Sequence, residues 1–347
     1  MLLKLNFPRN NEASRQGRIV LAGDIGATKS NLALFRVENG NFTSLQEAQF
    51  KSSDYRNIIE LTDSFMKGSS APDTICFGVA GPVLNGHAKL SNIKWDIDSQ
   101  ELSDHFNVKI VHLINDLEAT AFGLSMLDEK ELKVLHKGSE VPVGNAAIIA
   151  PGTGLGEAGI YWDGNYYHPF ATEGGHSDFA PRNLFDFELY SFLQRKFGHV
   201  SWERLVCGPG IVNIYHFLRD EKKREEPAWL KAKMENSDAA SVISKHADQN
   251  ELCKETMQLF VRYLAHESAN LVLKLKATGG LFIGGGIAPH LISLLEDGAF
   301  YTSYCDSGRL NYLLEMVPVS VILNTRTALL GAANYGASQL MEKEQLA

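Results

Sequence analysis

Two stretches of the chain share one pattern, and this duplication constrains the fold more than any other feature. In each, a short apolar strand, a turn of small residues and a second strand follow one another, at 18–35 and at 146–162. The turns are Gly23–Ser30 and Pro151–Gly156. Backbone N–H groups in such turns can approach an anion closely. Two facing turns could hold a polyphosphate from both sides, and the repetition predicts an internally duplicated α/β protein.

The remaining periodicity alternates buried strands with helices. Parallel pairing is expected where a strand, a helix and a strand succeed one another. Residues 92–96, which include Trp95, have the character of an exposed loop. Helices are predicted over 55–67, from 251 onward and over 327–340, and strands over 74–80, 281–283 and 319–323.

One apolar run, residues 109–114, ends abruptly in Asn115 and Asp116 before a segment with good helix propensity. It predicts a buried strand that delivers these two polar residues to the start of a helix. In open α/β sheets, ligands bind at the carboxyl ends of strands. Asp is also a preferred N-cap. Asp116 therefore either caps the helix, serves a binding site, or does both.

Three further segments combine glycine with polar residues. Glu173–His176 places an acid and an imidazole around two glycines, which suits hydrogen bonding to a polyol, although a solvated surface loop has the same composition. Ser201–Arg204 is predicted to begin a helix, and Gly208–Gly210 to break one. Gly284–Gly286 would let a flat ligand lie against bare backbone, or would form a plain strand-to-helix turn.

Composition excludes several classes of protein. A chain of 347 residues that is 44% hydrophobic can bury a large core and favours two domains. A net charge of -8 disfavours a nucleic-acid partner. No apolar run has the length of a membrane span. Four cysteines lie far apart and predict neither a zinc site nor a disulfide framework, which fits a reducing cytoplasm: Cys76, Cys207, Cys253 and Cys305.

Six motifs occur in order, and together they carry a resemblance. They are GDIGATKSN, LIND, PGTGLG, EGGHSDFAP, the segment from SWER to CGPG, and GGGIAP. With them the chain resembles the bacterial-type glucokinase family, within the actin, Hsp70 and hexokinase-like ATPase fold, from about Ile19 to the C-terminal helix. The resemblance implies an α/β, two-lobed actin-like (ribonuclease H-like) fold. Each lobe is expected to be a mixed sheet flanked by helices, with the active-site cleft between the lobes.

The expected domains follow from this fold. A small α/β domain is expected over 18–126, completed by the C-terminal helix 324–347, and a large α/β domain over 127–323. Residues 1–17 are expected to form an extension outside the core.

The resemblance also implies roles for individual residues. Asp116 would be the general base of a sugar-binding pair with Asn115, and Glu173, His176 and Glu203 would bind the ring hydroxyls. Asp24 would hold magnesium through water. The nucleotide would be bound by the first phosphate loop, the second phosphate loop and the adenosine loop: Gly23, Asp24, Gly26, Thr28 and Lys29; Gly152, Thr153 and Gly154; Gly284, Gly285 and Gly286.

The implied activity is ATP-dependent phosphorylation of D-glucose at its 6-hydroxyl, with Mg2+, by a cytoplasmic homodimer that binds neither nucleic acid nor membrane. Another hexose or amino-sugar kinase of the related ROK family is an alternative, although that family usually carries a cysteine-rich zinc loop and Cys207 stands alone. A catalytically inactive sugar-sensing protein is a second alternative, but the base and the phosphate loops are all present.

Two positions depart from the family pattern. Ala27 stands where a second glycine is usual, so the first loop is expected to be slightly stiffer. Glu157 stands where a small apolar residue is common, and a carboxylate facing the phosphates would repel ATP. We therefore expect Glu157 to face away from the loop.

Overall fold

The computed structural model describes residues 5–7, 17–90, 92–138 and 142–342. Within these ranges the chain forms two compact units. The N-terminal unit comprises the described residues of 5–131, 160–171 and 324–342, and the central unit comprises those of 132–159 and 172–323. No helix of the described residues is long and apolar enough to cross a membrane.

The N-terminal unit is built on a five-stranded sheet in the order β3-β2-β1-β4-β8. β1, β2 and β3 pair antiparallel, whereas β4 runs parallel to β1 and β8. A small sheet is made by β5, β6 and β7. The strands are β1 (Arg18–Ile25), β2 (Lys29–Glu38), β3 (Asn41–Lys51), β4 (Thr74–Val79), β5 (Val83–Leu84), β6 (His87–Leu90), β7 (Trp95–Asp98) and β8 (Val111–Asn115). The helices are α1 (Ile58–Met66), α2 (Ser99–Phe106), α3 (Asp116–Leu124) and α12 (Thr327–Glu342).

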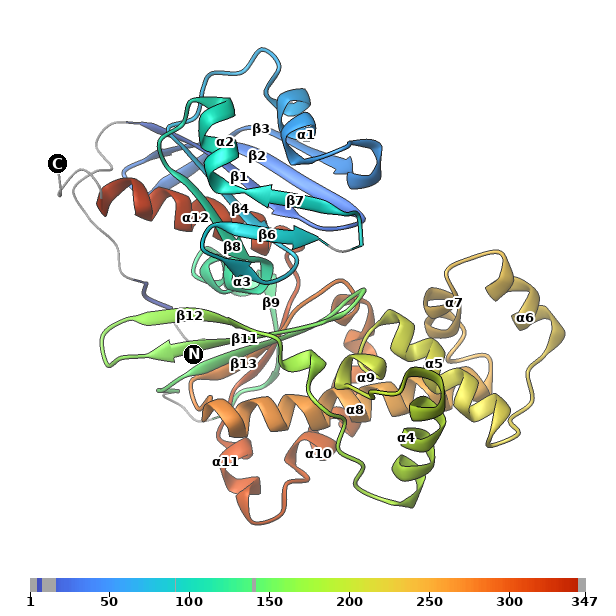
Figure 1. Cartoon of the computed structure of the whole chain (residues 1–347). Coiled ribbons are helices and arrows are strands. Elements are labelled where there is room, and N and C mark those ends of the chain that lie inside the picture. Colours follow the sequence, from blue (N-terminus) through green and yellow to red (C-terminus); the bar gives the residue numbers. More distant parts are fainter. Residues whose placement is uncertain (1–4, 8–16, 91, 139–141, 343–347) are drawn as a thin grey trace. The chain divides into compact units, whose positions relative to one another are not determined.

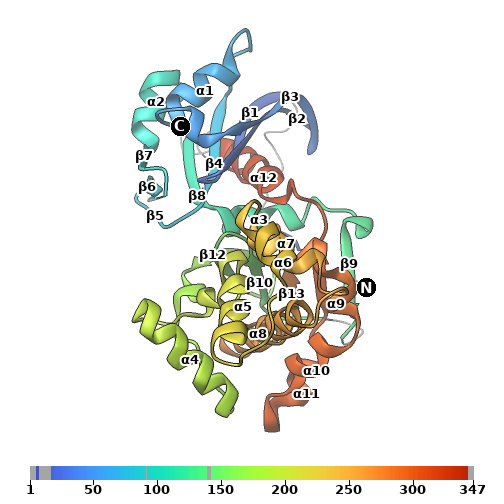
Figure 2. The same ribbon diagram turned by 90° about the vertical axis from the view of Figure 1, so that its right-hand side faces the viewer.

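Helices cover both faces of this sheet. α12 runs along one face and α1 and α2 lie on the opposite side (Figures 1 and 2). β4 is buried at all six positions, as expected for a parallel strand that is covered on both faces. The buried β4 therefore holds the two strands beside it, β1 and β8, whose ends carry polar residues of the site.

The central unit contains most of a six-stranded sheet in the order β12-β11-β10-β13-β14-β9. β10, β13 and β14 are parallel, and β9 pairs antiparallel with β14. The strands are β9 (Leu132–His136), β10 (Ala146–Pro151), β11 (Leu155–Trp162), β12 (Tyr167–Thr172), β13 (Gly280–Ile283) and β14 (Val319–Ile322). The helices are α4 (Leu184–Phe197), α5 (Gly208–Asp220), α6 (Ala228–Glu235), α7 (Ala239–Lys245), α8 (Glu251–Leu275), α9 (Ile292–Glu296), α10 (Ala299–Cys305) and α11 (Asn311–Glu315).

The long helix α8 forms the centre of this unit's core. It runs beside the sheet, with α5 and α10 packed against it (Figure 1). Residues from 252 to 272 along α8 are buried on more than one face, because α8 packs against both the sheet and these helices.

The duplicated pattern is confirmed. β1 and β2 enclose the first glycine-containing turn as an antiparallel hairpin, and β10 and β11 are neighbouring strands around the second. The predicted helices near 58, 251 and 327 and the strands near 74, 281 and 319 are also present. The fold class predicted from the duplication is therefore the one observed in each unit.

Three local expectations are wrong. Trp95 does not lie in an exposed loop: it begins β7 and is 3% exposed, because its indole packs into the apolar core beneath the small sheet. Gly208–Gly210 does not break a helix but begins α5, since Pro209 occupies the first turn, where proline is tolerated. Ser201–Arg204 gives only a 3-10 turn, Trp202–Arg204.

The predicted N-terminal extension lies largely outside the described residues, at 1–4 and 8–16. Its described part does not lie outside the core. Leu5 and Phe7 are buried, and the Phe7 ring lies 5.0 Å from the Phe122 ring. The Asn6 carbonyl accepts a hydrogen bond of 2.9 Å from the Tyr167 N–H. Apolar side chains and a strand partner together hold this short segment in place.

Candidate active site

In the N-terminal unit, the predicted polar residues collect at the carboxyl ends of neighbouring strands. Asp24 is near the end of β1, Asn115 ends β8, and β4 lies between them. Asp24 pairs in register with Gly78 and Asn115 with Val79. Strands separated by one intervening strand are roughly 10 Å apart, so one small ligand group could reach both ends.

Asn115, and not Asp116, is the N-cap of α3. Its Oδ1 accepts hydrogen bonds from Leu117 N at 2.9 Å and from Glu118 N at 3.4 Å. Its Nδ2 donates to the Gly81 carbonyl at 3.2 Å. Asp116 is the first helical residue, where the positive end of the helix dipole stabilises its carboxylate. Asn115 therefore occupies the N-cap position, and Asp116 Oδ1 also accepts a hydrogen bond from Leu117 N at 2.9 Å.

Asp24 is held by an amide network on the hairpin. Asn31 Nδ2 donates to Asp24 Oδ2 at 3.1 Å, and Gln49 Nε2 donates to Asn31 Oδ1 at 2.8 Å. Burial raises the pKa of Asp24, and the Asn31 hydrogen bond partly lowers it. A half-buried carboxylate of this kind favours a cation nearby.

The turn that follows Asp24 is fixed from the neighbouring strand. Gly26 N donates to Lys29 O at 3.1 Å, and Ser52 Oγ donates to the Gly26 carbonyl at 2.7 Å. Ala27 does not adopt a left-handed backbone conformation, so alanine fits here without strain. Ser52 was not predicted, because it is distant in sequence and reaches the turn only through the pairing of β2 with β3.

In the central unit, backbone hydrogen bonds join the turn Pro151–Gly156 to the start of α5 and to the segment that follows Gly284–Gly286. Gly152 N donates to Gly154 O at 2.8 Å and Gly208 N to Gly152 O at 2.9 Å. Ile287 N donates to Pro151 O at 3.3 Å. Gly285 has φ +77° against Pro151, a conformation and approach that favour glycine. Segments more than 130 residues apart in sequence are thus joined.

These segments form one wall of a cavity of about 1200 Å³ in the central unit. The predicted residues Gly152, Thr153, Gly286 and Glu203 line it. Arg204 and Pro209, from the SWER to CGPG segment, line it too, and so do residues that the sequence did not single out: among them are Lys196, Asp238, Ser241, Lys245 and His290. The 236–245 segment carries no glycine motif. Its one local signal is the N-cap pattern in which Asp238 accepts a hydrogen bond from Ser241 N.

Glu203 lies at the second glycine turn. Its Oε2 accepts a hydrogen bond from Leu155 N at 3.0 Å. Two 3-10 turns of the central unit are joined nearby, since Trp202 N donates to Ser177 O at 3.0 Å. The structure thereby brings the Glu203 segment to the end of the predicted Glu173–His176 segment.

Glu173 precedes the 3-10 turn Gly174–His176 and His176 ends it, and both side chains are exposed. His176 N donates to Glu173 O at 3.0 Å, which closes the turn. The imidazole rings of His176 and His199 lie 4.9 Å apart. Exposed acid and imidazole groups on a closed turn can hydrogen-bond to a hydroxylated ligand.

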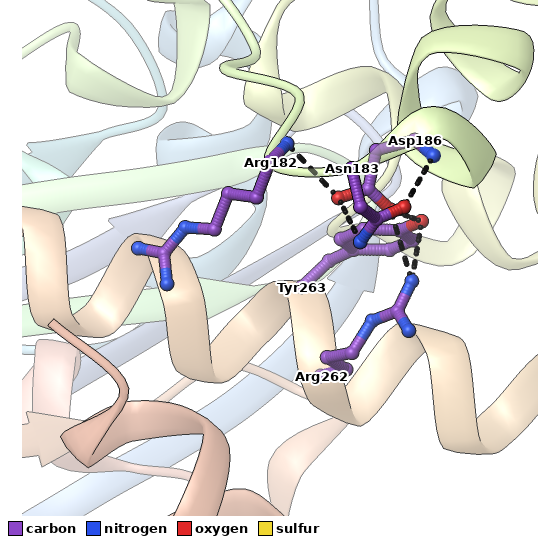
Figure 3. Close-up of polar contacts among 5 residues, drawn as sticks. All are labelled: Arg182, Asn183, Asp186, Arg262 and Tyr263. Atoms are coloured by element: carbon purple, nitrogen blue, oxygen red, sulfur yellow. Dashed lines mark hydrogen bonds and ion pairs between the residues drawn. The ribbon is translucent and has the colours of Figure 1, made fainter. Parts of the chain in front are cut away.

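A buried carboxylate anchors the chain beyond this turn (Figure 3). Asp186, at the start of α4, accepts hydrogen bonds from Arg182 N at 3.1 Å and from Asn183 Nδ2 at 3.0 Å. From α8, Arg262 Nη2 donates to it at 2.9 Å and Tyr263 OH at 2.8 Å. The segment that follows the EGGHSDFAP motif is therefore fixed to the central helix.

Glu157 faces the interior of the central unit, as expected, and does not line the cavity. Its side chain is 2% exposed and contacts Gly174 and Glu267. Burial is the first cause that raises its pKa, followed by the negative charge of Glu267.

Each of the two units is built on a mixed sheet with glycine turns and carboxylates at strand ends, an arrangement that can bind phosphates and a hydroxylated ligand. Comparisons with known proteins identify the chain more closely. The family model described as glucokinase matches residues 21–339. The chain belongs to the glucokinase family.

Individual relatives agree over nearly the whole length. The glucokinase of Trichormus variabilis is 38% identical over 91% of this chain and 98% of its own. That of a Nostoc species is 37% identical with the same coverage. A crystal structure of glucokinase from an Antarctic psychrotroph is similar with a TM-score of 0.79 and 28% identity, covering 93% of this chain and 99% of that chain. The predicted family, fold and hexose kinase activity are confirmed.

Proposed function

We propose that this protein transfers the γ-phosphoryl group of ATP to the 6-hydroxyl of D-glucose, the first step of glycolysis. One observation carries the proposal beyond family membership. The cavity of about 1200 Å³ is lined by Gly152 and Thr153, by Gly286, and by Glu203, which we propose binds a sugar hydroxyl. The glycine turn proposed to bind the nucleotide and the carboxylate proposed to bind sugar hydroxyls line the same cavity.

ATP is the donor that best fits this cavity. Ligand pockets typically measure roughly 300–1,000 Å³, so there is room for a nucleoside as well as its phosphates. Gly152, Thr153 and Gly154 would bind phosphates through backbone N–H groups, and Gly284–Gly286 would lie against adenosine. The N-terminus of α5, at Gly208, adds a positive dipole at the phosphate end. Gly23, Gly26, Thr28 and Lys29 would form the other phosphate loop.

Asp24 fits a magnesium ion that is held mainly by water and phosphate oxygens. Mg2+ in kinases is commonly bound through one or two carboxylates, and Asp24 is a half-buried carboxylate that accepts a hydrogen bond from Asn31 Nδ2. The ion would neutralise charge on the phosphates. The protein's part is to keep Asp24 ionised and oriented through the Asn31–Gln49 network.

Asp116 is proposed as the general base, which accepts the proton of the glucose 6-hydroxyl as that oxygen attacks phosphorus. General-base catalysis contributes about 10²–10⁴-fold. Asn115 would orient the sugar and also caps α3. The same side chain would therefore hold both the sugar and the start of the helix that carries Asp116. Glu173, His176 and Glu203 would bind ring hydroxyls, and such sites strongly reject analogues that leave polar groups unpaired.

We propose a small domain of residues 18–126 and 324–347 and a large domain of residues 127–323. We also propose that the protein is a cytoplasmic homodimer that binds no nucleic acid. The compact units support the first proposal, and the charge of -8 and the four free cysteines support the others. Light scattering on protein that elutes from a size-exclusion column tests the dimer. A mass of twice 38.3 kDa is expected, and a mass near 38.3 kDa would contradict the dimer.

A panel of phosphoryl acceptors and donors tests the substrates. Purified protein with Mg2+ and ATP is supplied with glucose, fructose, mannose or N-acetylmannosamine, and ADP release is followed. We expect the highest kcat/KM with glucose. A higher value with another sugar would replace the acceptor, and turnover with ADP or polyphosphate above that with ATP would replace the donor.

A further inference from the structure

Glu157 is a buried acid that the proposed reaction does not use. It lies on β11 directly after the second phosphate turn. Its Oε2 packs against Gly174, in the space that a Cβ at Gly174 would occupy. Its Oε1 is buried, with no hydrogen-bond partner among the described residues. The carboxyl group thus fills the space beneath the turn Gly174–His176.

The opposite side of this carboxyl group faces α8. Its side chain is hydrogen-bonded to Glu267, whose Oε2 also accepts from Asn270 Nδ2 at 2.7 Å and whose Oε1 accepts from Lys274 Nζ at 3.4 Å. Two carboxylates cannot hydrogen-bond to each other unless one is protonated. Glu267 has the amide and the ammonium donors, so the shared proton belongs to Glu157.

The charged groups that face Glu157 are therefore Glu267 and Lys274, both on α8. Burial and the charge of Glu267 raise the pKa of Glu157, and Lys274 lowers it by a smaller amount. Burial also raises the pKa of Glu267. Since two carboxylates in hydrogen-bonding contact repel each other strongly when both are charged, Glu157 and Glu267 together hold one proton at neutral pH.

Glu157 is also linked to the sugar-binding turn through the backbone. Thr172 Oγ1 donates to the Glu157 carbonyl at 2.9 Å, and Gly174 N donates to Thr172 Oγ1 at 3.2 Å. The turn that carries Glu173 and His176 is consequently held to Glu157 by hydrogen bonds on one side and by side-chain packing beneath Gly174 on the other.

We propose that the uncharged Glu157 side chain is a positioning residue for the turn Gly174–His176, and that its ionisation displaces this turn and weakens glucose binding. The inference rests on the proposed function, because it takes Glu173 and His176 as sugar ligands. The carboxyl group is confined between Glu267 and Gly174, so an ionised Glu157 repelled by Glu267 moves against the turn.

The test compares KM for glucose, KM for ATP and kcat between pH 6.5 and 9 in the wild type, Glu157→Gln and Glu235→Gln. In the wild type, KM for glucose should rise by up to about tenfold per pH unit once Glu157 ionises. KM for ATP and kcat should change much less. The glutamine variant keeps the shape and the donor to Glu267 without an ionisable group, so the rise should disappear.

Glu235, an exposed residue at the end of α6, is the matched control, and its variant should keep the wild-type rise. Thermal unfolding checks that each variant folds, and the wild-type profile tests the proposal even if Glu157→Gln does not fold. Calorimetric titration of glucose at pH 7 and pH 9 provides the same comparison without turnover.

A wild-type KM for glucose that is independent of pH, or an equal rise in Glu157→Gln, would overturn the positioning role while glucose phosphorylation stands. If the wild type neither phosphorylates nor binds glucose at any pH, the proposed function itself fails.

Discussion

At the scale of single residues, the site depends on the division of labour between Asn115 and Asp116. Asn115 takes both the cap position and the bond to the Gly81 carbonyl. Its neighbour Asp116 is the first residue of α3, and its Oδ1 accepts a hydrogen bond from Leu117 N at 2.9 Å. The sequence predicts that both residues follow a strand, but it does not show which of them caps the helix, since Asn and Asp are nearly equally favoured as N-caps.

Replacement of the base tests this division. Asp116→Asn keeps size and helix position and removes the proton acceptor, so kcat should fall by about 10²–10⁴-fold while glucose affinity is largely kept. Stopped-time assays for kcat and calorimetry for glucose affinity measure the two effects. Retention of most of the wild-type kcat would exclude Asp116 as the base.

The buried Asp186 is predicted to matter for stability. Asp186→Ala leaves Arg262 and Tyr263 without their shared acceptor, and should lower the free energy of unfolding by about 3 kcal/mol, measured with urea. This is the lower end of the range for buried pairs, because a third of the Arg262 side chain remains in water. Asp220→Ala, which removes a more exposed ion pair with Arg219, is the control and should cost at most about 1 kcal/mol.

The role of Asp186 could not be predicted from the sequence. Asp186 follows the motif that ends at Pro181, but its partners Arg262 and Tyr263 lie 76 and 77 residues after Asp186. Nothing in local spacing relates these positions. The glycine turns could be predicted because their chemistry is contiguous in sequence, whereas Ser52, Asp238 and Lys245 reach the sites only through tertiary packing.

At the scale of elements, α3 and α12 approach each other through glycine. A Cβ on Gly331 of α12 would overlap the Ala119 carbonyl of α3, and one on Gly123 of α3 would overlap the Thr327 carbonyl. This close contact holds the helix that begins with Asp116 against the C-terminal helix. The predicted range 327–340 is close to the observed α12, and only the start of α3 was predicted; the contact between the two helices was not predictable from either alone.

Gly331→Ala should therefore separate the two helices. We expect a loss of about 1–3 kcal/mol in the free energy of unfolding, with a lower kcat, because α3 shifts with Asp116. Urea titration and steady-state kinetics measure these effects. Gly17→Ala is the control, since its Cβ meets nothing closer than 3.5 Å; an equal loss in both variants would contradict the role of the helix contact.

Strands were harder to predict than helices. β3 is mostly exposed along its length and alternates weakly, so it has little hydrophobic signal, and β5 is only two residues long. The buried parallel strands β4, β13 and β14 were found because every residue in them is buried. The outline of the sheets was thus readable from apolar runs, and their edges were not.

At the scale of the whole molecule, stability should depend on pH through His266. Burial and the nearby Arg182 and Arg262 lower the pKa of His266 to about 4, despite the opposing charges of Asp186 and Asp306. The unfolded chain, with an ordinary imidazole pKa near 6.5, binds this proton first. Stability is therefore lost as pH falls from about 6.5 toward 4, at up to about 1.4 kcal/mol per pH unit.

The check is to compare unfolding of the wild type and His266→Gln at pH 7 and pH 5. The variant should lose less stability on acidification, whereas His105→Gln, at an exposed imidazole that pairs with Asp63, should not reproduce this effect. Equal acid sensitivity in the wild type and His266→Gln would show that other groups account for the pH dependence.

The proposed reaction moves a phosphoryl group from ATP to oxygen 6 of glucose. The most direct measurement is ³¹P NMR of a single reaction that contains the protein, Mg2+, ATP and glucose. We predict that ADP and glucose 6-phosphate appear in equal amounts as ATP disappears. Unchanged ATP, a phosphate on another sugar oxygen, or inorganic phosphate without a sugar phosphate would contradict the account.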